Sequence, residues 1–469
     1  MSFDFDLIVI GSGPAGEKAA AKAAYFGKKV AVIERGPGVG GQCTKGGLPS
    51  KILRESALAY AGARHKLIEV FEPAPRQSMQ MSSFLRAVDS VCDARDTRVR
   101  RNLDRHQVEL LTGSATLIDA HRVRLSTPND TRVLSAEIIV IATGSRPSRP
   151  AFIPFDDRTI FCSDTILTMK TLPRSMTVIG GGVIGSEYAS IFATLGVSVH
   201  LIEERHTLIG FLDEEMAGHL CAQFSRRGVA LHLGESVSRC ELLKDGGAAV
   251  TTSKSAKIES EVVLFSGGRL ANTEEIGLAE AGVKLGDKGR PVVDKFFRTS
   301  VSNIYAIGDL IGFPALASTS MEQGRVAVGH AFGLDDGRER TLATLPYGIY
   351  TIPSVSMFGK TEQALRADGK PYVVGHASYG EQDRGRLNGD VEGVLKLICD
   401  RDTRQILGIH ILGDGAEELI HLGQACVQLG GTADYFLQAV FNFPTMSSLY
   451  KAAAYDVLTN LGKRQNSLR

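Results

Sequence analysis

A short apolar strand, a glycine-rich turn, a helix and a second strand ending in an acidic residue follow one another twice in this chain, at residues 5–34 and 176–203. This order is typical of a Rossmann-like βαβ unit, in which the turn and the start of the helix face a ligand. The 469 residues also exceed one ordinary core, because domains of about 100–200 residues are the norm. The sequence therefore predicts an α/β protein with two Rossmann-like domains and a smaller α+β domain after them.

The charge balance excludes partners that are recognised by a strong basic surface. The net charge is +1 and 22% of the residues are charged, so we expect neither a nucleic acid nor a membrane surface as partner. The one basic stretch alternates with aspartates, which favours a solvated helix face over a binding patch. Its arginines are Arg95, Arg98, Arg100, Arg101 and Arg105.

Cysteine usage and hydropathy favour a protein of the reducing cytoplasm. The seven cysteines are scattered and form no C-x-x-C pair, which is typical of free thiols rather than of a disulfide framework or a zinc site. We predict no metal. The apolar run Leu7–Ile10 is too short for a signal segment and follows acidic residues, and no run reaches the roughly 18 apolar residues of a membrane span.

The first glycine turn, Gly11–Gly16, has the spacing G-x-G-x-x-G between a strand and an alanine-rich helix. Gly11 permits a tight turn, Gly13 lets the backbone approach a pyrophosphate, and Gly16 lets the helix pack closely on the strand. The helix N-terminus offers N–H groups to the phosphates. Glu34 ends the next strand and can accept both ribose hydroxyls of an adenosine.

The second glycine turn repeats this pattern with Gly180, Gly182 and Gly185, and its acidic residue is Glu203. Two such folds predict two dinucleotides. One can be a fixed flavin and the other an exchanging nicotinamide, with hydride passing between stacked rings. Glu203 favours the 2′-hydroxyl of NAD and disfavours the 2′-phosphate of NADP, while Arg205 could offset that repulsion.

Further motifs show that the chain resembles the group I flavoprotein disulfide reductases, such as glutathione reductase and lipoamide dehydrogenase, over essentially its whole length. They are the A-T-G-S-R-P stretch at 142–147, G-G-R at 267–269, I-Y-A-I-G-D at 304–309, and the segments at 316–317 and 322–324. In this family the aspartate of the third motif, here Asp309, binds the flavin ribitol. The helix that follows points its N-terminus at the flavin pyrimidine edge, where it would stabilise negative charge.

The resemblance implies FAD as cofactor and a division into three domains. Residues 1–150 and 275–345 would form the FAD-binding domain, residues 151–274 the NAD(P)-binding domain, and residues 346–469 a dimerisation domain. In the last domain we expect strands at 349–353 and 393–397 and a helix at 416–429. The expected cofactor-binding residues are Gly11, Gly13, Gly16, Glu34, Arg35, Cys43, Lys51, Thr143, Gly144, Gly180, Gly182, Gly185, Glu203, Gly268, Asp309 and Ala317.

The chain departs from the disulfide reductases at both parts of their thiol chemistry. Where they carry C-x-x-x-x-C before I-P-S-K, this chain has Cys43 and then Gly47, in a loop one residue shorter. Their C-terminal H-x-H-P-x-x-x-E becomes a segment with Phe443 and Ser448. Without a second thiol no dithiol can carry electrons away, and a phenyl ring cannot exchange protons.

Two residues of the family's flavin site are retained. Lys51 matches the lysine near flavin N5 and Glu187 matches its ion-pair partner, so the resemblance implies that these two are catalytic. Val183 stands where glutathione reductase has a gating tyrosine, which suggests a less obstructed nicotinamide pocket.

One branch of the family lacks the second cysteine as this chain does, namely the soluble, energy-independent pyridine nucleotide transhydrogenases. The segments 182–192, 211–216 and 441–446 are similar to theirs. The implied reaction is a ping-pong transfer in which NADPH reduces FAD and NAD then takes the hydride in the same pocket. The shorter loop, Ser448 and the Glu203–Glu204 pair depart from what that branch would require.

Other functions remain open at this point. A thiol peroxidase or disulfide enzyme could use Cys43 alone, although a buried inert cysteine is the favoured interpretation of that residue. An NAD(P)H:quinone or dye reductase would share the flavin and the missing thiols, with an acceptor near Cys43 and Phe443. A flavin-binding protein with vestigial chemistry would bind FAD without being reduced by either nucleotide. For every alternative the resemblance implies a homodimer or a larger homo-oligomer.

Overall fold

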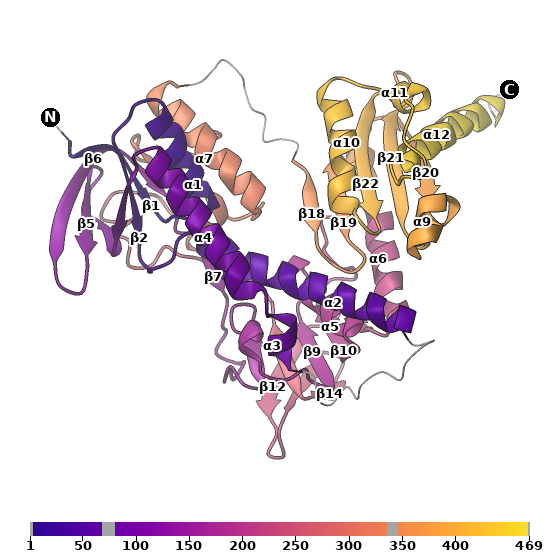
Figure 1. The fold of residues 1–469 in the computed structure, drawn as a ribbon, viewed down its shortest axis with the longest axis horizontal. Helices are drawn as coiled ribbons and strands as arrows, with labels where there is room; N and C mark the ends of the chain where they lie inside the picture. Colours follow the sequence, from indigo (N-terminus) through magenta and orange to yellow (C-terminus); the bar gives the residue numbers. More distant parts are fainter. Residues whose placement is uncertain (1–2, 68–79, 335–344, 468–469) are drawn as a thin grey trace. The chain divides into compact units, whose positions relative to one another are not determined.

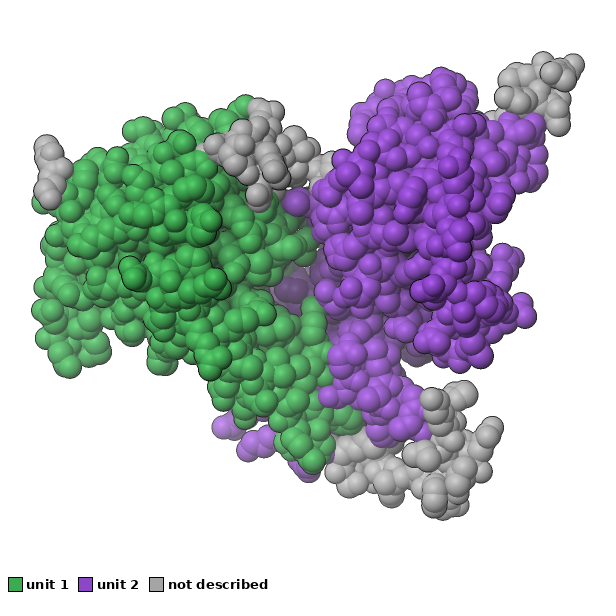
Figure 2. All heavy atoms as spheres, turned by 45° about the horizontal axis from the view of Figure 1, so that its top comes forward, with its two compact units in different colours: residues 1–52, 82–148, 268–342 green, residues 53–81, 149–267, 343–469 purple. Residues whose placement is uncertain are grey.

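The computed structural model describes residues 3–67, 80–334 and 345–467. They divide into two compact units, which Figure 2 colours separately. Unit 1 holds residues 1–52, 82–148 and 268–342, and unit 2 holds residues 53–81, 149–267 and 343–469. Each unit contains one of the two glycine turns, so each is described in its own right.

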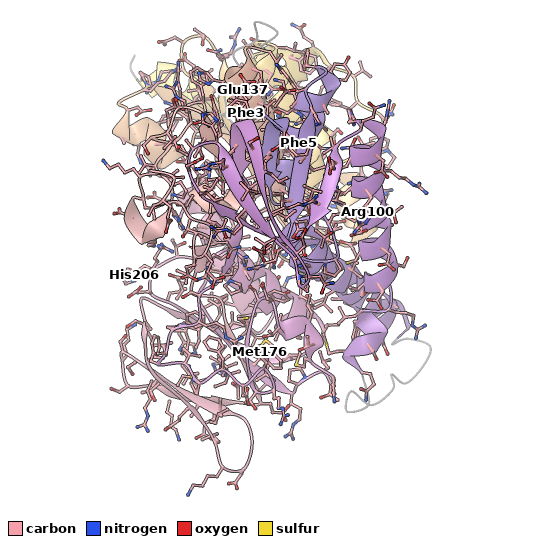
Figure 3. The ribbon with its side chains drawn as sticks, turned by 90° about the vertical axis from the view of Figure 1, so that its left-hand side faces the viewer. Phe3, Phe5, Arg100, Glu137, Met176 and His206 are labelled. Atoms are coloured by element: carbon pink, nitrogen blue, oxygen red, sulfur yellow. The ribbon has the colours of Figure 1, made fainter. Side chains whose placement is uncertain are left out.

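Unit 1 is built on a seven-stranded sheet in the order β3-β2-β1-β6-β5-β4, with β17 also paired to β6 (Figure 1). The strands β3, β2, β1, β6 and β17 run parallel, whereas β4 and β5 add an antiparallel flap. Figure 3 labels Phe5, the first residue of β1. The bounds are β1 Phe5–Ile10, β2 Val30–Glu34, β3 Glu109–Thr112, β4 Ser114–Leu117, β5 Arg122–Ser126, β6 Thr131–Ile141 and β17 Ile304–Ala306.

Three helices share an apolar core with the central strands of this sheet: α1 (Pro14–Tyr25), α4 (Val88–Arg105) and α7 (Ala317–Phe332). Helix α1 is so rich in alanine that a second helix can approach it closely. The contact falls at Gly324 of α7, where a Cβ would lie 2.4 Å from the carbonyl oxygen of Ala15. Small residues on both helices therefore set how closely α1 and α7 pack.

The expected solvated face of α4 is correct for Arg98, Arg101 and Arg105, which are exposed, but wrong for Arg95. The Arg95 guanidinium is buried and donates to the equally buried carboxylate of Glu17 on α1, at 3.1 Å. A buried charge is tolerable only with such a partner. The position of Glu17 on a distant segment could not be foreseen from the local charge pattern.

Unit 2 begins with a parallel five-stranded sheet in the order β11-β10-β9-β15-β8 and an antiparallel meander of β12, β13 and β14. The bounds are β8 Ile160–Cys162, β9 Ser175–Ile179, β10 Ser198–Glu203, β11 Ala230–Leu233, β12 Val237–Leu242, β13 Ala248–Thr252, β14 Lys257–Ser260, β15 Val262–Phe265, α5 Val183–Thr194 and α6 Glu214–Arg226. Met176 on β9 is labelled in Figure 3.

The C-terminal part of unit 2 is an antiparallel sheet in the order β18-β19-β22-β21-β20 with helices packed on it (Figure 1). Its core includes Phe436 and Tyr450, whose ring centroids are 4.6 Å apart. The bounds are β18 Tyr347–Ile349, β19 Val355–Gly359, β20 Tyr372–Ser378, β21 Val394–Asp400, β22 Ile406–Leu412, α8 Glu362–Ala367, α9 Asp383–Asn388, α10 Ala416–Gln428, α11 Ala433–Gln438 and α12 Ser448–Ser467.

The remaining regular elements are short connectors, apart from one long helix. They are a π-helical turn at Cys43–Gly47, α2 Leu48–Leu67, α3 Met81–Phe84, β7 Ser145–Pro147, β16 Arg269–Ala271 and 3₁₀ turns at Ile166–Thr168, Asp287–Gly289, Gly308–Ile311 and Tyr379–Glu381. Among the described helices none has a stretch long and apolar enough to cross a membrane.

The predicted fold class is confirmed, with shifts at element ends. Both helices of the glycine turns begin inside the motif, α1 at Pro14 and α5 at Val183. In α1 this start is favoured because proline is well suited to a first helical position. The strand expected at 349–353 is wrong in its extent. Strand β18 ends at Ile349, and residues 350–354 form an irregular segment before β19.

Replacing Gly324 by alanine tests the packing of α1 on α7. We expect the variant to lose about 1–3 kcal/mol of stability, because the new Cβ meets backbone and cannot be accommodated by a rotamer change. Urea unfolding followed by circular dichroism measures this. The control is Gly218→Ala at an exposed position of α6, where a Cβ meets nothing within 4 Å and stability should stay equal or rise by up to about 1 kcal/mol. Equal stabilities of the two variants would contradict the packing argument.

Candidate functional site

The first glycine turn has the geometry of a phosphate-binding loop. Gly11 has φ +105° and a Cβ there would lie 2.4 Å from the Ala142 carbonyl oxygen, while a Cβ on Gly16 would lie 2.0 Å from the carbonyl oxygen of Gly11. At Gly13, by contrast, a Cβ would meet nothing within 4 Å. The backbone in front of α1 is therefore open where a pyrophosphate would approach the helix N-terminus.

Glu34 is held at the end of β2 by backbone and hydroxyl donors. Its Oε2 accepts hydrogen bonds from the Ser12 backbone N–H at 3.0 Å and from the Ser12 hydroxyl at 2.6 Å. The same hydroxyl oxygen accepts from the backbone N–H of Gly40 at 3.1 Å. Ser12 thus fixes the acidic residue and the loop after β2 together. Sequence reasoning missed this role, although a serine between two motif glycines was the available signal.

The second glycine turn in unit 2 reproduces this arrangement. Gly180 has φ +104°, and a Cβ on Gly185 would lie 1.9 Å from the Gly180 carbonyl oxygen. Gly182 faces open space, as Gly13 does. Glu203 is only 7% exposed, and its carboxylate accepts hydrogen bonds from the backbone N–H groups of Gly181 at 2.6 Å and Arg205 at 2.9 Å.

Two arginines that follow Glu203 in the chain, Arg205 and Arg226, have different carboxylate partners. The Arg205 side chain is 68% exposed and its Nη1 lies 3.7 Å from Glu203 Oε1. Arg226 instead donates to Glu392 at 2.8 Å. Of these two, Arg205 is the one beside Glu203.

Asp309 follows β17 in a short turn that is tied to α7. The backbone N–H of Gly308 donates to Gln323 Oε1 at 2.7 Å, and the Ser145 hydroxyl donates to Asp309 Oδ2 at 3.3 Å. Helix α7 begins at the exposed Ala317 with no side chain capping its first N–H groups. These donors remain available to a ligand, as the resemblance implies for a flavin.

Thr143 and Gly144 lie between β6 and β7, and Asn272, which follows β16, holds them in place. The Thr143 hydroxyl donates to the Asn272 carbonyl at 2.8 Å and the Asn272 amide donates to the Thr143 carbonyl at 2.8 Å. Gly144 and Gly268 have φ of +69° and +136°, a conformation that favours glycine. Arg35 is exposed and lies in the loop directly after β2.

Among the residues that the structure describes, the buried hydroxyls of Thr44 and Thr319 in unit 1 find no hydrogen-bond partner. Thr44 lies in the π-helical turn beside Cys43, and Thr319 is 1% exposed in the first turn of α7. An unpaired buried hydroxyl costs about 1–3 kcal/mol. Both segments are ones that the resemblance assigns to flavin contacts, so these orphan groups fit a polar ligand such as FAD.

Glu187 on α5 is 6% exposed, and its Oε1 accepts a hydrogen bond from the Tyr350 backbone N–H at 2.9 Å. One turn further along α5, Ser190 Oγ accepts from the Ile352 backbone N–H at 3.0 Å. The irregular segment at 350–354 therefore fixes Glu187 from outside its own helix. Lys51 lies half-buried on α2 in unit 1, and its pairing with Glu187 in unit 2 stays a prediction.

The thiol-bearing loop contains a single cysteine. Cys43 opens the π-helical turn that ends at Gly47, and all seven cysteines are unpaired. Cys92 on α4 donates its thiol to the Thr44 carbonyl at 3.1 Å, and burial, aided by nearby acidic groups, raises the pKa of that thiol. In the C-terminal part, Phe443 is 81% exposed and the Ser448 hydroxyl donates to Gln382 at 2.6 Å.

Known proteins are similar to this chain over nearly its whole length. Residues 5–324 match the family model "Pyridine nucleotide-disulphide oxidoreductase", and residues 345–454 match the dimerisation domain of the same family. Proteins named "Soluble pyridine nucleotide transhydrogenase" are similar throughout. The one from Mycobacterium tuberculosis is 40% identical over 98% of each chain, and the one from Pectobacterium atrosepticum is 42% identical over 98% of each chain.

Solved structures show the same fold. The crystal structure of LpdA from Mycobacterium tuberculosis superposes with a TM-score of 0.88 at 26% identity, covering 96% of this chain and 99% of that one. The flavoprotein disulfide reductase RclA from Escherichia coli has a TM-score of 0.84 at 26% identity, with 96% and 99% covered. On the family match over nearly its whole length, the chain belongs to the pyridine nucleotide-disulphide oxidoreductases.

Proposed function

We propose that this chain is an FAD-dependent pyridine nucleotide transhydrogenase that passes hydride between NADPH and NAD⁺ without a redox disulfide. The observation that carries the proposal is the near-complete coverage of relatives with that name at 40–42% identity. Two nucleotide-binding turns of the same geometry, one in each unit, support it. The single cysteine of the loop at 43–47 favours direct transfer over a thiol relay.

The residues of unit 1 fit the FAD. Gly11, Gly13 and Gly16 with the N-terminus of α1 would hold the diphosphate, Glu34 the adenosine ribose, and Asp309 the ribitol. The free N–H groups at the start of α7 would face the pyrimidine edge and stabilise negative charge there. When bound, FAD supplies a ring that accepts a hydride from one nicotinamide and returns it to another.

The residues of unit 2 fit the nicotinamide nucleotides in the same way. Gly180, Gly182 and Gly185 would receive the diphosphate at the start of α5, and Glu203 the ribose. Glu187, held by Tyr350, would orient Lys51 near the reacting atoms. No group has to donate a proton for a hydride to pass between two rings, so the phenyl ring of Phe443 in place of a histidine is compatible with this reaction.

The organisation of the chain follows from the same assignment. Residues 1–150 and 275–345 form the FAD-binding domain, residues 151–274 the NAD(P)-binding domain and residues 346–469 the dimerisation domain. The match of residues 345–454 to a dimerisation domain supports a homodimer. Seven unpaired cysteines are compatible with a cytoplasmic location.

The proposed reaction is tested by separating its two halves without oxygen. NADPH should bleach the flavin of the purified protein. After free nucleotide is removed, thio-NAD⁺ should restore the oxidised spectrum as reduced thionicotinamide appears. Rapid, saturable reoxidation by a quinone with no reaction of thio-NAD⁺ would instead establish the quinone reductase. Failure of both NADPH and NADH to bleach the flavin would leave a flavin-binding protein without this activity.

Trivalent arsenic distinguishes direct transfer from a thiol relay, because it binds two neighbouring thiols and blocks them. We expect arsenite added to the NADPH-reduced protein to leave the transhydrogenase rate unchanged, since the loop at 43–47 provides one thiol. A dithiol enzyme of the same family serves as the positive control. Inhibition that requires prior reduction by NADPH would contradict the proposal.

Arg205 should govern the choice between the two nucleotides. A charged hydrogen bond contributes about 1.5–3 kcal/mol, so we expect Arg205→Ala to raise the KM for NADPH by about 10- to 100-fold relative to that for NADH. Steady-state kinetics with a dye acceptor measures both constants. Arg226→Ala is the matched control, because Arg226 is paired with Glu392. Equal changes for NADPH and NADH would show that Arg205 does not meet the 2′-phosphate.

A further inference from the structure

A fully buried lysine lies among three carboxylates in unit 2. Lys396 on β21 has no exposed surface, and its ammonium lies 2.7 Å from Asp213 Oδ1, 2.8 Å from Glu215 Oε2 and 2.5 Å from Glu362 Oε2. These three carboxylates are close enough together to hold a metal ion, but here the cation among them is the ammonium of Lys396. Burial alone would lower the pKa of Lys396, yet the hydrogen bonds to the three acids outweigh it and raise that pKa, so the group stays charged.

The acids come from two different parts of the chain. Asp213 and Glu215 stand at the start of α6 in the nucleotide-binding part, whereas Glu362 begins α8 in the C-terminal part. Figure 1 shows α6 beside the C-terminal sheet, to which β21 belongs. Asp213 also accepts the backbone N–H of Glu215 and that of Glu362, so one carboxylate caps both helices. Lys396 therefore joins two helix starts to one strand.

Further bonds surround this cluster of Lys396 with its three acids. The Gln363 amide donates to the Leu212 carbonyl at 2.7 Å, and Arg366 pairs with Glu214 at 2.5 Å. His376 on β20 lies 3.0 Å from Glu215, and hydrogen bonds from His219 and His376 hold the pKa of the Glu215 carboxyl well below its usual range. Each residue from Leu212 to Glu215 is thus bonded to the C-terminal part.

The same stretch is continuous with the second nucleotide turn. The chain passes from Glu203 through Arg205 to Asp213, and on the way the Ile209 backbone N–H donates to the Gly181 carbonyl at 2.9 Å. Leu208 is fully buried against Gly181, where an added Cβ would lie 2.8 Å from its side chain. The segment is held at one end by the glycine turn and at the other by Lys396.

We propose that Lys396 is a positioning residue for nucleotide binding, which holds the segment 204–213 against the second glycine turn so that Glu203 and Arg205 meet the adenosine end of the nicotinamide nucleotide. The inference rests on the proposed function only in requiring that NADPH or NADH binds at this turn. Because the segment lies at the adenosine end of the site, its displacement weakens binding and leaves hydride transfer in the bound state intact.

The test uses the FAD-loaded protein, with NADPH as reductant and ferricyanide as acceptor. For Lys396→Met we expect the KM for NADPH and the equilibrium Kd for NADP⁺, which does not reduce the flavin, each to rise about tenfold, with kcat within about twofold and with unchanged flavin content and spectrum. Lys360→Met is the matched control, because Lys360 makes an exposed surface pair with Asp368, and its constants should equal those of the parent protein.

Milder variants keep the test decisive if Lys396→Met does not fold. Asp213→Asn and Glu362→Gln each weaken one bond to Lys396, and both should shift KM in the same direction by a smaller factor. Unchanged KM in a folded, FAD-loaded variant would overturn the proposal, as would a fall in kcat at constant KM. Because ferricyanide accepts the electrons, this test does not depend on whether thio-NAD⁺ is reduced. Failure of the proposed function would be detected in the thio-NAD⁺ experiment instead.

Discussion

At each of the two glycine turns a helix passes over the end of a strand so closely that no side chain fits between them. A Cβ on Gly16 or on Gly185 would lie within 2.0 Å of a carbonyl oxygen of the same turn. This approach places the free N–H groups of α1 and α5 at the mouth of the turn, where they would attract the diphosphate of the proposed dinucleotide. The same turns also position the acidic residues, because a backbone N–H group of each turn donates a hydrogen bond to Glu34 or to Glu203.

The proposed chemistry depends on the loop at residues 43–47, which corresponds to the thiol-bearing loop of the disulfide reductases. In disulfide-reducing members of the family a dithiol takes the electrons from the flavin, but this chain has one cysteine in the corresponding loop. Two features that the resemblance assigns to the flavin site are present, namely an α7 whose first turn has no side-chain cap and a buried Glu187. A chain with both nucleotide folds and one cysteine in this loop is suited to the proposed hydride transfer from one nicotinamide to another, which agrees with the names of its relatives.

The parts of the structure that depend on local patterns could be predicted from the sequence. Strand β1 begins at Phe5, where the predicted βαβ pattern begins, and both glycine turns lie where the spacing indicated, because glycine and an apolar run are local signals. Interactions between distant segments could not be predicted in this way. Arg95 is buried because Glu17 faces it from another helix, and Glu187 is fixed by Tyr350 far along the chain. The role of Lys396 could not be predicted, because the carboxylates that surround a lysine in an apolar strand can be identified only in the folded structure.

The central claim is that electrons leave the flavin directly for a nicotinamide, with no sulfur group storing them. The most direct measurement is an anaerobic titration of the purified protein with dithionite, followed through the flavin absorbance. Direct transfer predicts that one equivalent, which delivers two electrons per FAD, completes the bleaching without any long-wavelength band of a thiolate–flavin contact. A requirement for two equivalents, with such a band at the halfway point, would reveal a functional dithiol and contradict the account.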